Sequence, residues 1–542
     1  MATVDLPCAR PRTPPAVRHR VPLLATVPTL PLYAVWALFL ATGGGDLAAQ
    51  QAWARFAADH GTSAYNLFWY GGMHTANYSL ISPYVMAGLG VRPVTVVSGL
   101  AAAWLGAVLL VRTGIARPLP PAVLLSLALW CDVASGRTTF ALGVALGLGA
   151  CVALTGRRGY AAGALCAALA TTASPVAGLF LAVVGAGWLG VRDWGRAVAY
   201  LVPPALVVGA TTLLFPFQGE QLMPPDRIWP PVVFSLALVV AGPRRWRVAR
   251  WAAGVYAAGT VVTYLVPSPV GTNVERLAEL AAPAALLAAL LARPPGRYRL
   301  RSLALAVALV LSSAWVAQKT VDDLRVSTRV PAWAADTHDV VRELERLGAD
   351  RTRVEVIPAR NHREATALAP YVNMARGWNR QLDVERGRLF YDGTFSAATY
   401  RAWLDRWAVG FVVLPEGTPD GFAEQEAAFV RSGPGYLEPV WRGPHWRIYR
   451  VRDAVPLVSA PAAVVGSDGA RVTVRFERAG TATLKVAYSP WLTSERGCLT
   501  VRPQPGGEFT ELVATAPGTY RVGSGWERAP SPGPSASGCR AG

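Results

Sequence analysis

The stretch TGGGDLAAQQAWARFAADHGTSAYNLFWYGGMHTANYSLISP, residues 42–83, lies directly behind the first long apolar run of the chain. It combines many aromatic side chains with Asp46 and two His. About five residues are enough to connect two neighbouring helices. The length and composition of the stretch therefore predict a structured outer loop and raise the question of what that loop does.

The composition divides the chain into two regions. Hydrophobic residues make up 52% of the 542 positions, which is too many for an ordinary soluble enzyme. The last part of the chain, roughly 220 residues, nevertheless has the composition of a soluble domain. The net charge of +18 comes almost entirely from Arg, since Lys319 and Lys485 are the two lysines. These charges are scattered among apolar segments, so a nucleic-acid partner is not expected.

Eleven apolar stretches approach the length of a membrane span, about 20 residues. They cover residues 22–42, 91–111, 119–134, 138–155, 159–173, 175–191, 197–215, 228–242, 249–266, 277–292 and 301–318. The first is long enough to span and remain, so no cleaved signal peptide is expected.

Arg residues alternate along the turns between these stretches. If the N-terminus is cytoplasmic, the inner turns hold eighteen Arg, whereas the outer turns hold Arg55, Arg137, Arg227 and Arg276. Short cytoplasmic turns carry the excess of positive charge. The alternation therefore predicts a polytopic α-helical membrane protein of about eleven transmembrane helices, with its N-terminus inside and everything after Lys319 outside.

The outer half has two different patterns. From about residue 333, segments with helical spacing alternate with short strands such as RVEVIPA and GFVVLPEG, which predicts a small α/β domain. Farther on, ARVTVRFERAGTATLKVAYS alternates with period two, which predicts a β-sandwich. The end of the chain is rich in Pro, Gly and Ser, as flexible segments are.

Five regions follow from these patterns. They are a cytoplasmic tail (1–21), a transmembrane domain (22–320) with its long first outer loop (43–83), an outer α/β domain (321–453), an outer β-sandwich (454–525) and a flexible tail (526–542).

The six Cys divide between the two regions. Four are expected to be small buried side chains or idle thiols, namely Cys8, Cys131, Cys151 and Cys166. Cys498 and Cys539 lie in the outer soluble part, and that compartment permits disulfides. We predict that these two pair and tie the tail to the sandwich. Neither CxxC nor HExxH occurs, so no metal ligands are predicted.

Asp46 follows three glycines at the predicted outer boundary of the first helix. One interpretation is a helix cap, because Asp is a good N-cap residue and DLAAQQAWARFAADHG has helical spacing. The other is a carboxylate held at the lipid–water boundary as a general base or cation ligand. The two roles are compatible.

The aromatic run behind this helix also has two interpretations. Trp69 and Tyr70 stand near His74 and Asn77 in SAYNLFWYGGMHTANYS. Aromatic belts are common at membrane interfaces. Aromatic faces with Asn and His donors equally suit a sugar or a lipid-linked head group, so these four residues are predicted to contact substrate.

Two outward Arg run against the positive-inside trend. Arg137 in CDVASGRTTF and Arg276 in VGTNVERLAEL each stand at a predicted helix end. They either reach from helix ends into water or bind phosphate, because a guanidinium matches phosphate oxygens with two hydrogen bonds. Asp132 is a candidate ion-pair partner or second acid beside Arg137, and Asn273 is a candidate substrate contact beside Arg276.

This layout resembles the GT-C superfamily of membrane glycosyltransferases: many helices, a cytoplasmic N-terminus, an acidic residue in a long first outer loop and a soluble outer domain at the C-terminus. Asp46 falls where that superfamily has its catalytic carboxylate. The resemblance implies that Asp46 activates an acceptor hydroxyl while a sugar leaves a polyprenyl-phosphate carrier with inversion. TTASPVAGLFL and GRTTFALG look like turns of actinobacterial proteins of this type.

The resemblance has one departure. Many members carry Asp-x-Asp or Asp-x-Glu in the first loop, whereas the residue two positions after Asp46 is Ala48, which argues against a metal-bridged mechanism. The sequence specifies no cofactor, and a divalent cation stays an open alternative.

The expected function is transfer of a sugar to a cell-envelope glycan or lipid acceptor at the outer face of the plasma membrane. The partners would be the bilayer, a polyprenyl-phosphate-linked sugar and the acceptor. A transporter or flippase, and a non-catalytic scaffold for envelope assembly, remain alternative classes. The outer segments ARGWNRQLD and LFYDGTFSAATYRAWL either bind glycan or form packed loops.

Overall fold

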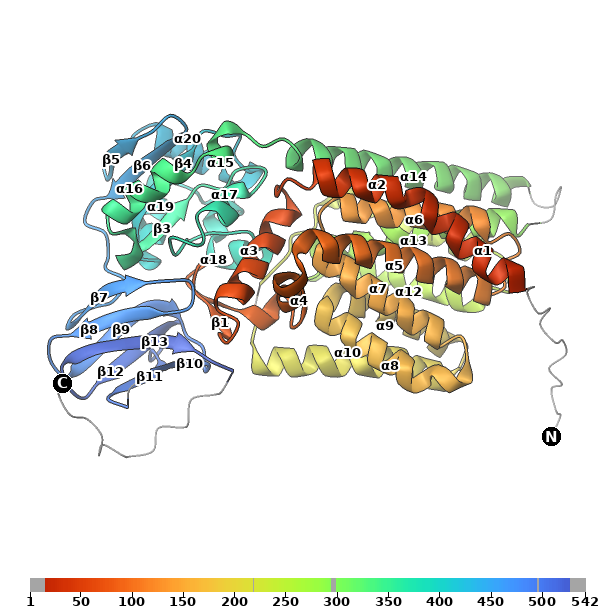
Figure 1. Cartoon of the computed structure of the whole chain (residues 1–542), viewed down its shortest axis with the longest axis horizontal. Helices are drawn as coiled ribbons and strands as arrows, with labels where there is room; N and C mark the ends of the chain where they lie inside the picture. The colour runs from red at the N-terminus through yellow and green to blue at the C-terminus, as the bar shows by residue number, and fades with distance from the viewer. Residues whose placement is uncertain (1–14, 218, 294–298, 495–496, 527–542) are drawn as a thin grey trace.

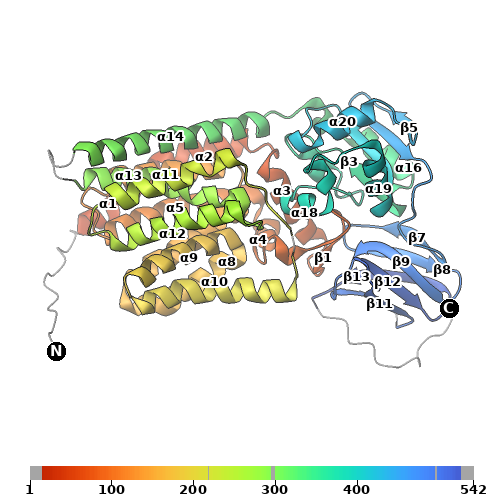
Figure 2. The same cartoon turned by 180° about the vertical axis from the view of Figure 1, so that it is seen from behind.

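The computed structural model describes residues 15–217, 219–293, 299–494 and 497–526. A helical bundle forms one end of the elongated molecule, and two β-containing domains lie next to each other at the other end (Figure 1). Seen from behind, α14 runs along the edge of the bundle toward the α/β domain (Figure 2). The ends of both predicted tails, residues 1–14 and 527–542, lie outside the described residues.

The first apolar run is helical but irregular. It consists of α1 (Pro15–Thr26), η1 (Val27–Thr29), α2 (Leu30–Val35) and the π-helical η2 (Trp36–Leu40). Proline lacks the N–H that a helix interior needs, and Pro22, Pro28 and Pro31 lie in this run. The interruptions by 3₁₀ and π turns follow from this placement.

The other helices of the bundle occupy the remaining apolar stretches. They are α5 (Val91–Arg112), α6 (Leu119–Ala134), α7 (Thr138–Ala153), α8 (Tyr160–Ala173), α9 (Pro175–Gly190), α10 (Trp194–Leu214), α11 (Trp229–Ala241), α12 (Arg247–Leu265), α13 (Glu275–Leu291) and α14 (Arg299–Ser327).

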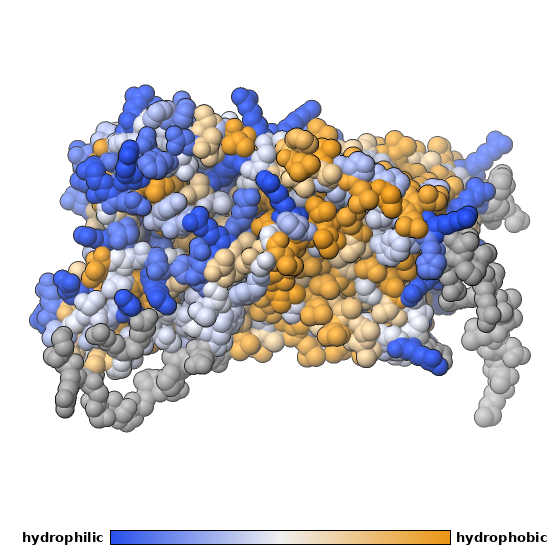
Figure 3. Space-filling view, viewed as in Figure 1, coloured by the Kyte–Doolittle hydropathy of each residue, from blue (hydrophilic) through white to orange (hydrophobic). Residues whose placement is uncertain are grey.

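Among the described residues, four helical segments are long and apolar enough to cross a membrane: His19–Leu40, α5, α10 and α14. Helices α6 to α9 are shorter and apolar. In the view of Figure 3 apolar surface covers the bundle, whereas hydrophilic surface gathers on the two β-containing domains and at the far end of the bundle. An exposed apolar surface of this extent marks a membrane-embedded region. That all eleven stretches span, and that the N-terminus is cytoplasmic, stays a prediction.

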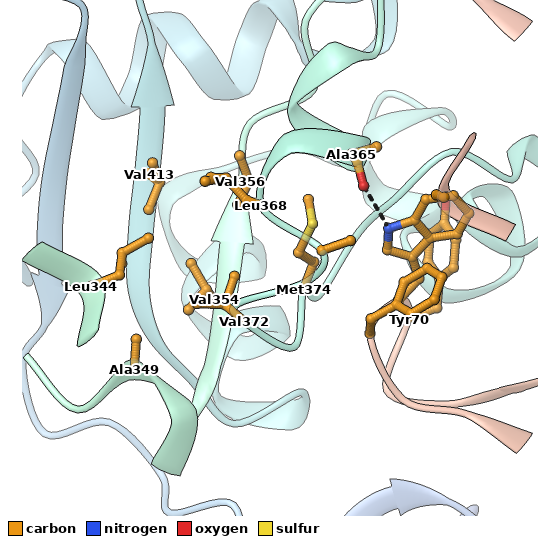
Figure 4. Packing of buried hydrophobic residues seen from close by; sticks show 14 of the residues in the cluster. Tyr70, Leu344, Ala349, Val354, Val356, Ala365, Leu368, Val372, Met374 and Val413 are labelled. Carbon is orange, nitrogen blue, oxygen red and sulfur yellow. Dashed lines mark hydrogen bonds between the residues drawn. The ribbon is translucent and has the colours of Figure 1, made fainter. Parts of the chain in front are cut away.

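The long first loop packs between the bundle and both outer domains. Its elements are α3 (Asp46–Asp59), β1 (Tyr65–Asn66), β2 (Met73–His74), η3 (Thr75–Asn77) and α4 (Ser82–Leu89). Trp53, Trp69 and Tyr70 are at most 1% exposed. Tyr70 and Met374 of the α/β domain belong to one apolar cluster, part of which is drawn in Figure 4. The aromatic residues of this loop are therefore the core that joins the parts of the molecule.

Backbone hydrogen bonds fix the loop to both outer domains. The amide of Met374 donates to the carbonyl of Phe68 over 2.8 Å. The amide of Leu67 donates to the carbonyl of Gly469 over 2.7 Å, and the amide of Ala487 to the carbonyl of Gly71 over 2.9 Å. The loop thus pairs with the α/β domain on one side and with the sandwich on the other.

The α/β domain has a mixed four-stranded sheet in the order β3-β4-β6-β5. Its strands are β3 (Arg353–Val356), β4 (Val409–Pro415), β5 (Leu437–Arg442) and β6 (Trp446–Val451). Strands β3 and β4 are parallel and the other pairs are antiparallel. The helices of this domain are α15 (Ala332–Ala335), α16 (His338–Arg346), α17 (Arg363–Ala367), α18 (Arg380–Arg386), α19 (Ala397–Arg406) and α20 (Glu424–Arg431). Every residue of β4 is buried, as expected for a central strand covered on both faces.

The last domain has two antiparallel sheets, β10-β13-β8-β7 and β11-β12-β9. The strands are β7 (Ala462–Ser467), β8 (Val472–Phe476), β9 (Gly480–Ala487), β10 (Leu492–Ser494), β11 (Leu499–Pro503), β12 (Phe509–Ala514) and β13 (Gly518–Ser524). Val474 of one sheet and Leu484 and Leu512 of the other share one hydrophobic core. Tyr65 and Leu67 of the first loop extend that core, so the sandwich is attached to the loop by apolar packing.

Arg376 provides a test of how the α/β domain is held together. This side chain is 1% exposed and donates two hydrogen bonds to Asp383, over 2.8 and 2.7 Å, and one to Glu426 over 2.9 Å. Removing one partner of a buried ion pair costs about 3–5 kcal/mol, because the remaining charge stays desolvated. We expect Arg376→Ala to lower the free energy of unfolding by that amount in thermal or denaturant unfolding of the detergent-solubilised protein.

Arg406 is a matched control for this substitution. It forms the same two-bond pair with Glu508, over 2.7 and 2.8 Å, but its side chain is 52% exposed. Exposed pairs contribute at most about 1 kcal/mol, so Arg406→Ala should change stability little. Equal losses for the two variants would contradict the role given to burial.

Candidate functional site

Arg137 is the centre of a charge cluster at the end of the bundle that adjoins the outer domains, which we call the head of the bundle. It is the N-cap residue of α7 and follows Gly136, whose positive φ of 80° forms the tight turn after α6. Its guanidinium lies 2.6 Å from Glu279, and the other carboxylates around it are those of Asp46, Asp132 and Asp323, each at 3.5 Å. The Arg137 side chain is only 10% exposed. A buried cation requires such partners, because an unpaired charge is costly away from water.

Asp46 is placed by backbone geometry and does not cap its helix. Gly45 occupies the N-cap position of α3, and no side-chain cap bond is present there. The Asp46 carboxylate lies 3.5 Å from Nε of Arg137 and 3.9 Å from Nη2 of Arg276, and its side chain is 32% exposed. A carboxylate in the first turn also interacts favourably with the positive end of the helix dipole. Asp46 is therefore a charged group shared by two guanidinium groups and still open to solvent.

The glycine segment before Asp46 is held by hydrogen bonds from the α/β domain. Gly45 donates its amide to the carbonyl of Asn361 over 2.8 Å and accepts from Nε1 of Trp378 over 3.1 Å. Arg363 donates to the carbonyl of Thr42 over 2.5 Å and to the carbonyl of Ser327, the last residue of α14, over 2.6 Å. The outer domain thereby fixes the start of α3 and the end of α14 at one point.

A second ion-pair group adjoins the first. Lys319 of α14 bonds both Glu275 and Glu279 at the start of α13, and Arg227 lies 3.8 Å from Glu275. Because Glu279 also pairs with Arg137, the two groups form one continuous network. It joins α7, α13, α14 and the first loop at the head of the bundle.

A cavity of about 260 Å³ opens on this network. Its lining includes Arg137, Arg227, Arg276 and Lys319 together with Glu275 and Glu279. Asn273 in η6 (Gly271–Val274) also lines it, and the α/β domain contributes Arg380 and Phe422. The volume lies just below the usual range of ligand pockets, roughly 300–1,000 Å³, so the cavity fits a head group better than a long polymer.

The structure brings together some of the residues predicted as a site. Asp46, Arg137, Asp132 and Arg276 form one cluster, and Asn273 lines the adjoining cavity. Asp132 lies behind Arg137 and is 5% exposed. It therefore serves as a partner of the guanidinium and is not among the residues that line the cavity.

The predicted aromatic contacts lie elsewhere. Trp69 is 0% and Tyr70 1% exposed, and the Tyr70 hydroxyl accepts from the amide of Asn379 over 2.9 Å. His74 is 7% exposed and faces Ser489 of the sandwich, with Asn77 beside it. Trp69, Tyr70 and His74 pack between the loop and the outer domains, and Asn77 is half-buried beside His74. None of the four residues lines the cavity.

Sequence reasoning missed charged residues of the cavity and cluster, among them Glu279, Lys319 and Asp323, and it did not decide the role of Arg380. A sequence signal existed for the first three, because charged residues inside or at the ends of apolar helices usually face a partner or a functional site. Arg380 stood within the ARGWNRQLD segment, for which glycan binding and loop packing were both open. Of that segment, Arg376 is buried in the domain, whereas Arg380 reaches the cavity.

The other predicted features concern metals and disulfides. Within the described ranges, no group of three or more His, Cys, Asp or Glu is arranged to hold a metal ion. Cys131, Cys151 and Cys166 are free cysteines. Cys539 lies outside the described residues, so the pairing of Cys498 with Cys539 stays a prediction.

The fold and the cluster define a class: a membrane-type helical bundle with two C-terminal β-containing domains and a charged cavity at their junction. Residues 459–537, which include the sandwich, match a family described as a domain of unknown function (DUF8823). No curated protein matches the chain.

The solved structures similar to the chain include two of one enzyme. Both are cryo-EM structures of the arabinofuranosyltransferase AftD from Mycobacteria. One, a mutant form, is 16% identical with a TM-score of 0.45 over 80% of this chain and 42% of its own. The other is 15% identical with a TM-score of 0.45 over 85% of this chain and 41% of its own. The chain thus spans less than half the length of these structures, and similarity at this level assigns it no activity.

Gly44 offers a test of how tightly the segment before Asp46 packs against Ser327 and Arg363. A Cβ at this position would lie 2.7 Å from the carbonyl oxygen of Ser327 and 3.0 Å from Nη2 of Arg363. We expect Gly44→Ala to lower the free energy of unfolding by about 1–3 kcal/mol, the usual cost of overpacking. Gly88 in α4 is the control, because a Cβ there would meet nothing within 4 Å. Identical unfolding temperatures for both variants would contradict a tight contact at Gly44.

His74 should make stability depend on pH. Burial lowers the pKa of His74 from 6.5 to about 4, and the positive charge of Arg386 adds to the lowering. The folded protein therefore keeps His74 neutral, whereas the unfolded chain binds a proton once the pH falls below about 6.5. Stability from this group is complete above pH 6.5 and is lost as the pH falls toward 4. The total loss is about 3 kcal/mol, since one pKa unit corresponds to about 1.4 kcal/mol.

This dependence is measurable by unfolding between pH 4 and pH 8. His74→Gln removes the titrating group and should flatten the profile relative to wild type. His338→Gln changes a histidine whose side chain is 78% exposed and should leave the profile unchanged. A wild-type profile retained in His74→Gln would assign the pH dependence to other groups.

Proposed function

We propose that this protein is a membrane glycosyltransferase that moves a sugar from a polyprenyl-phosphate carrier to a cell-envelope glycan or lipid acceptor. One observation carries the proposal. A partly exposed carboxylate, Asp46, lies between the guanidinium groups of Arg137 and Arg276, and both Arg line a cavity at the head of an apolar bundle. The resemblance of the layout to the GT-C superfamily adds support.

The proposed topology has eleven spans, with a cytoplasmic N-terminus and both C-terminal domains outside. It rests on the alternation of Arg along the turns. The cavity would then open at the outer face of the membrane. A lipid carrier could keep its chain in the bilayer and present its phosphate at the level of Arg137 and Arg276.

The reaction requires a base and a group that stabilises the leaving phosphate. The Asp46 carboxylate would take the proton of the acceptor hydroxyl while the acceptor oxygen forms a bond to the anomeric carbon. The bond between that carbon and the phosphate oxygen would break, and polyprenyl phosphate would leave with the electron pair. Guanidinium groups bind phosphate oxygens with charge-assisted hydrogen bonds, which suits Arg276 and Arg137 to the developing charge.

Asp46→Asn tests the base. Reconstituted vesicles would be supplied with a panel of radiolabelled polyprenyl-phospho-sugars and membrane-envelope acceptors. Loss of a general base costs about 10²- to 10⁴-fold, so kcat should fall by at least 100-fold. Asp59→Asn is the matched control on the same helix, because Asp59 is 54% exposed and pairs only weakly with Arg55 at 3.4 Å. Transfer by Asp46→Asn at the rate of Asp59→Asn would refute this mechanism.

Binding of sugar-free polyprenyl phosphate separates the phosphate contact from the chemistry. The wild-type protein should bind it, and it should inhibit transfer as a product. Asp46→Asn should retain that binding, since it removes a negative charge next to the two Arg. A protein that takes up solutes into vesicles but transfers no sugar would instead be a transporter.

A further inference from the structure

The cavity has two walls from different parts of the chain. Arg137, Arg276 and Lys319 come from the bundle, whereas Arg380 and Phe422 come from the α/β domain. The two parts are held in register, because Glu220 donates its amide to the carbonyl of Gln381 and the Gln381 amide group donates to the carbonyl of Pro269, each over 3.2 Å. The outer domain is therefore a fixed wall of the cavity.

Arg380 is rigidly held in that wall. Its guanidinium pairs with both oxygens of Asp420, over 3.0 and 2.9 Å, and donates to the hydroxyl of Tyr391 over 2.9 Å. The rings of Trp378 and Phe422 lie 5.2 and 5.1 Å from it. These contacts use three of the five N–H groups, and the other two have no hydrogen-bond partner among the described residues. A donor pair is thus presented at little cost in side-chain entropy.

The charge of Arg380 is already balanced. Asp420 supplies one carboxylate to this guanidinium at 2.9 Å, and Arg380 is 17% exposed. The free N–H groups therefore offer hydrogen bonds without an unpaired positive charge. That favours hydroxyl groups over phosphate, which the proposed function assigns to Arg137 and Arg276 of the bundle.

Phe422 supplies an apolar face beside these donors. It is 41% exposed, although a large aromatic residue is usually covered, and it packs on Tyr391 with ring centroids 4.4 Å apart. Gln221 and Asn273, which both carry amide groups, line the same cavity. An aromatic face next to guanidinium and amide groups matches the C–H face and the hydroxyls of a sugar ring.

We propose that Arg380 and Phe422 form a sugar-binding subsite for a neutral ring of the acceptor glycan, so that the outer domain selects the acceptor while the bundle holds the lipid phosphate. The subsite rests on the proposed transferase function. The two walls of the cavity would bind different groups. The wall from the outer domain would bind the neutral hydroxyl groups of the acceptor, and the wall from the bundle would bind the lipid phosphate.

The test uses the full-length protein in nanodiscs and a panel of neutral furanose and pyranose oligosaccharides, followed by NMR titration. Arg380→Lys and Phe422→Ala should each weaken oligosaccharide binding by about tenfold, the effect of about 1.4 kcal/mol. In transfer assays they should raise the KM for acceptor and leave the KM for the lipid donor unchanged. Binding of sugar-free polyprenyl phosphate should also be unchanged.

Two matched controls accompany these variants. Arg401 forms a similar group outside the cavity, with Asp405 at 3.0 Å and the Tyr436 ring at 5.5 Å, so Arg401→Lys tests the exchange itself. Tyr371 is 43% exposed on the same domain, so Tyr371→Ala tests the loss of an exposed ring. Both should bind oligosaccharide like wild type.

The outcomes separate this inference from the transferase proposal. Oligosaccharide binding that is unaffected by Arg380→Lys and Phe422→Ala, or absent in a wild-type protein that transfers sugar, overturns the subsite. A raised KM for the lipid donor with unchanged oligosaccharide binding also overturns it and makes Arg380 a phosphate contact. Binding that depends on both residues in a protein without transferase activity supports the subsite and rejects the proposed reaction.

Discussion

The arrangement of the molecule depends on the point where Arg363 meets Thr42 and Ser327. The end of the first apolar run and the end of α14 both leave the bundle there, and one guanidinium binds a carbonyl from each. The Thr42 hydroxyl lies 2.9 and 2.8 Å from the carbonyl oxygens of Ser327 and Thr328 and shares its one proton between them. Carbonyl groups at helix ends need such donors, because no intrahelical partner remains for them. Satisfying them with a side chain of the α/β domain fixes that domain on the bundle.

The charged cluster is a consequence of the same position. At the head of an apolar bundle, charges are only partly hydrated, so each cation must be matched by carboxylates. Arg137 has four of them around it, and Lys319 bridges two glutamates. Such a network is stable only while its members remain in place. The network therefore forms a rigid, charged wall of the cavity.

The sequence predicted the elements better than their contacts. The apolar stretches coincide with helices, because a continuous run of apolar residues can be recognised from the local sequence without knowledge of tertiary contacts. Arg137 and Arg276 were singled out because outward Arg run against the trend of the turns, and Asp46 because it follows three glycines at the predicted outer end of the first helix. The three residues lie together. Trp69 and Tyr70 were assigned to substrate, yet they are buried between domains. An aromatic run has the same pattern in a lipid belt, a sugar site and a domain interface. Arg380 depends on how a distant domain docks, which no local pattern contains.

Three residues of helix α14 that contact different parts of the molecule lie on one face of the helix. Lys319, Asp323 and Ser327 follow one another at intervals of four residues, so they lie along one face of the helix. Lys319 lines the cavity, the Asp323 carboxylate lies 3.5 Å from Arg137, and the backbone carbonyl of Ser327 accepts a hydrogen bond from Arg363 of the outer domain. A rotation or axial shift of this one rod would change all three contacts together. A movement of the outer domain relative to the bundle would therefore shift α14 and change the positions of Lys319 and Asp323 in the charged network.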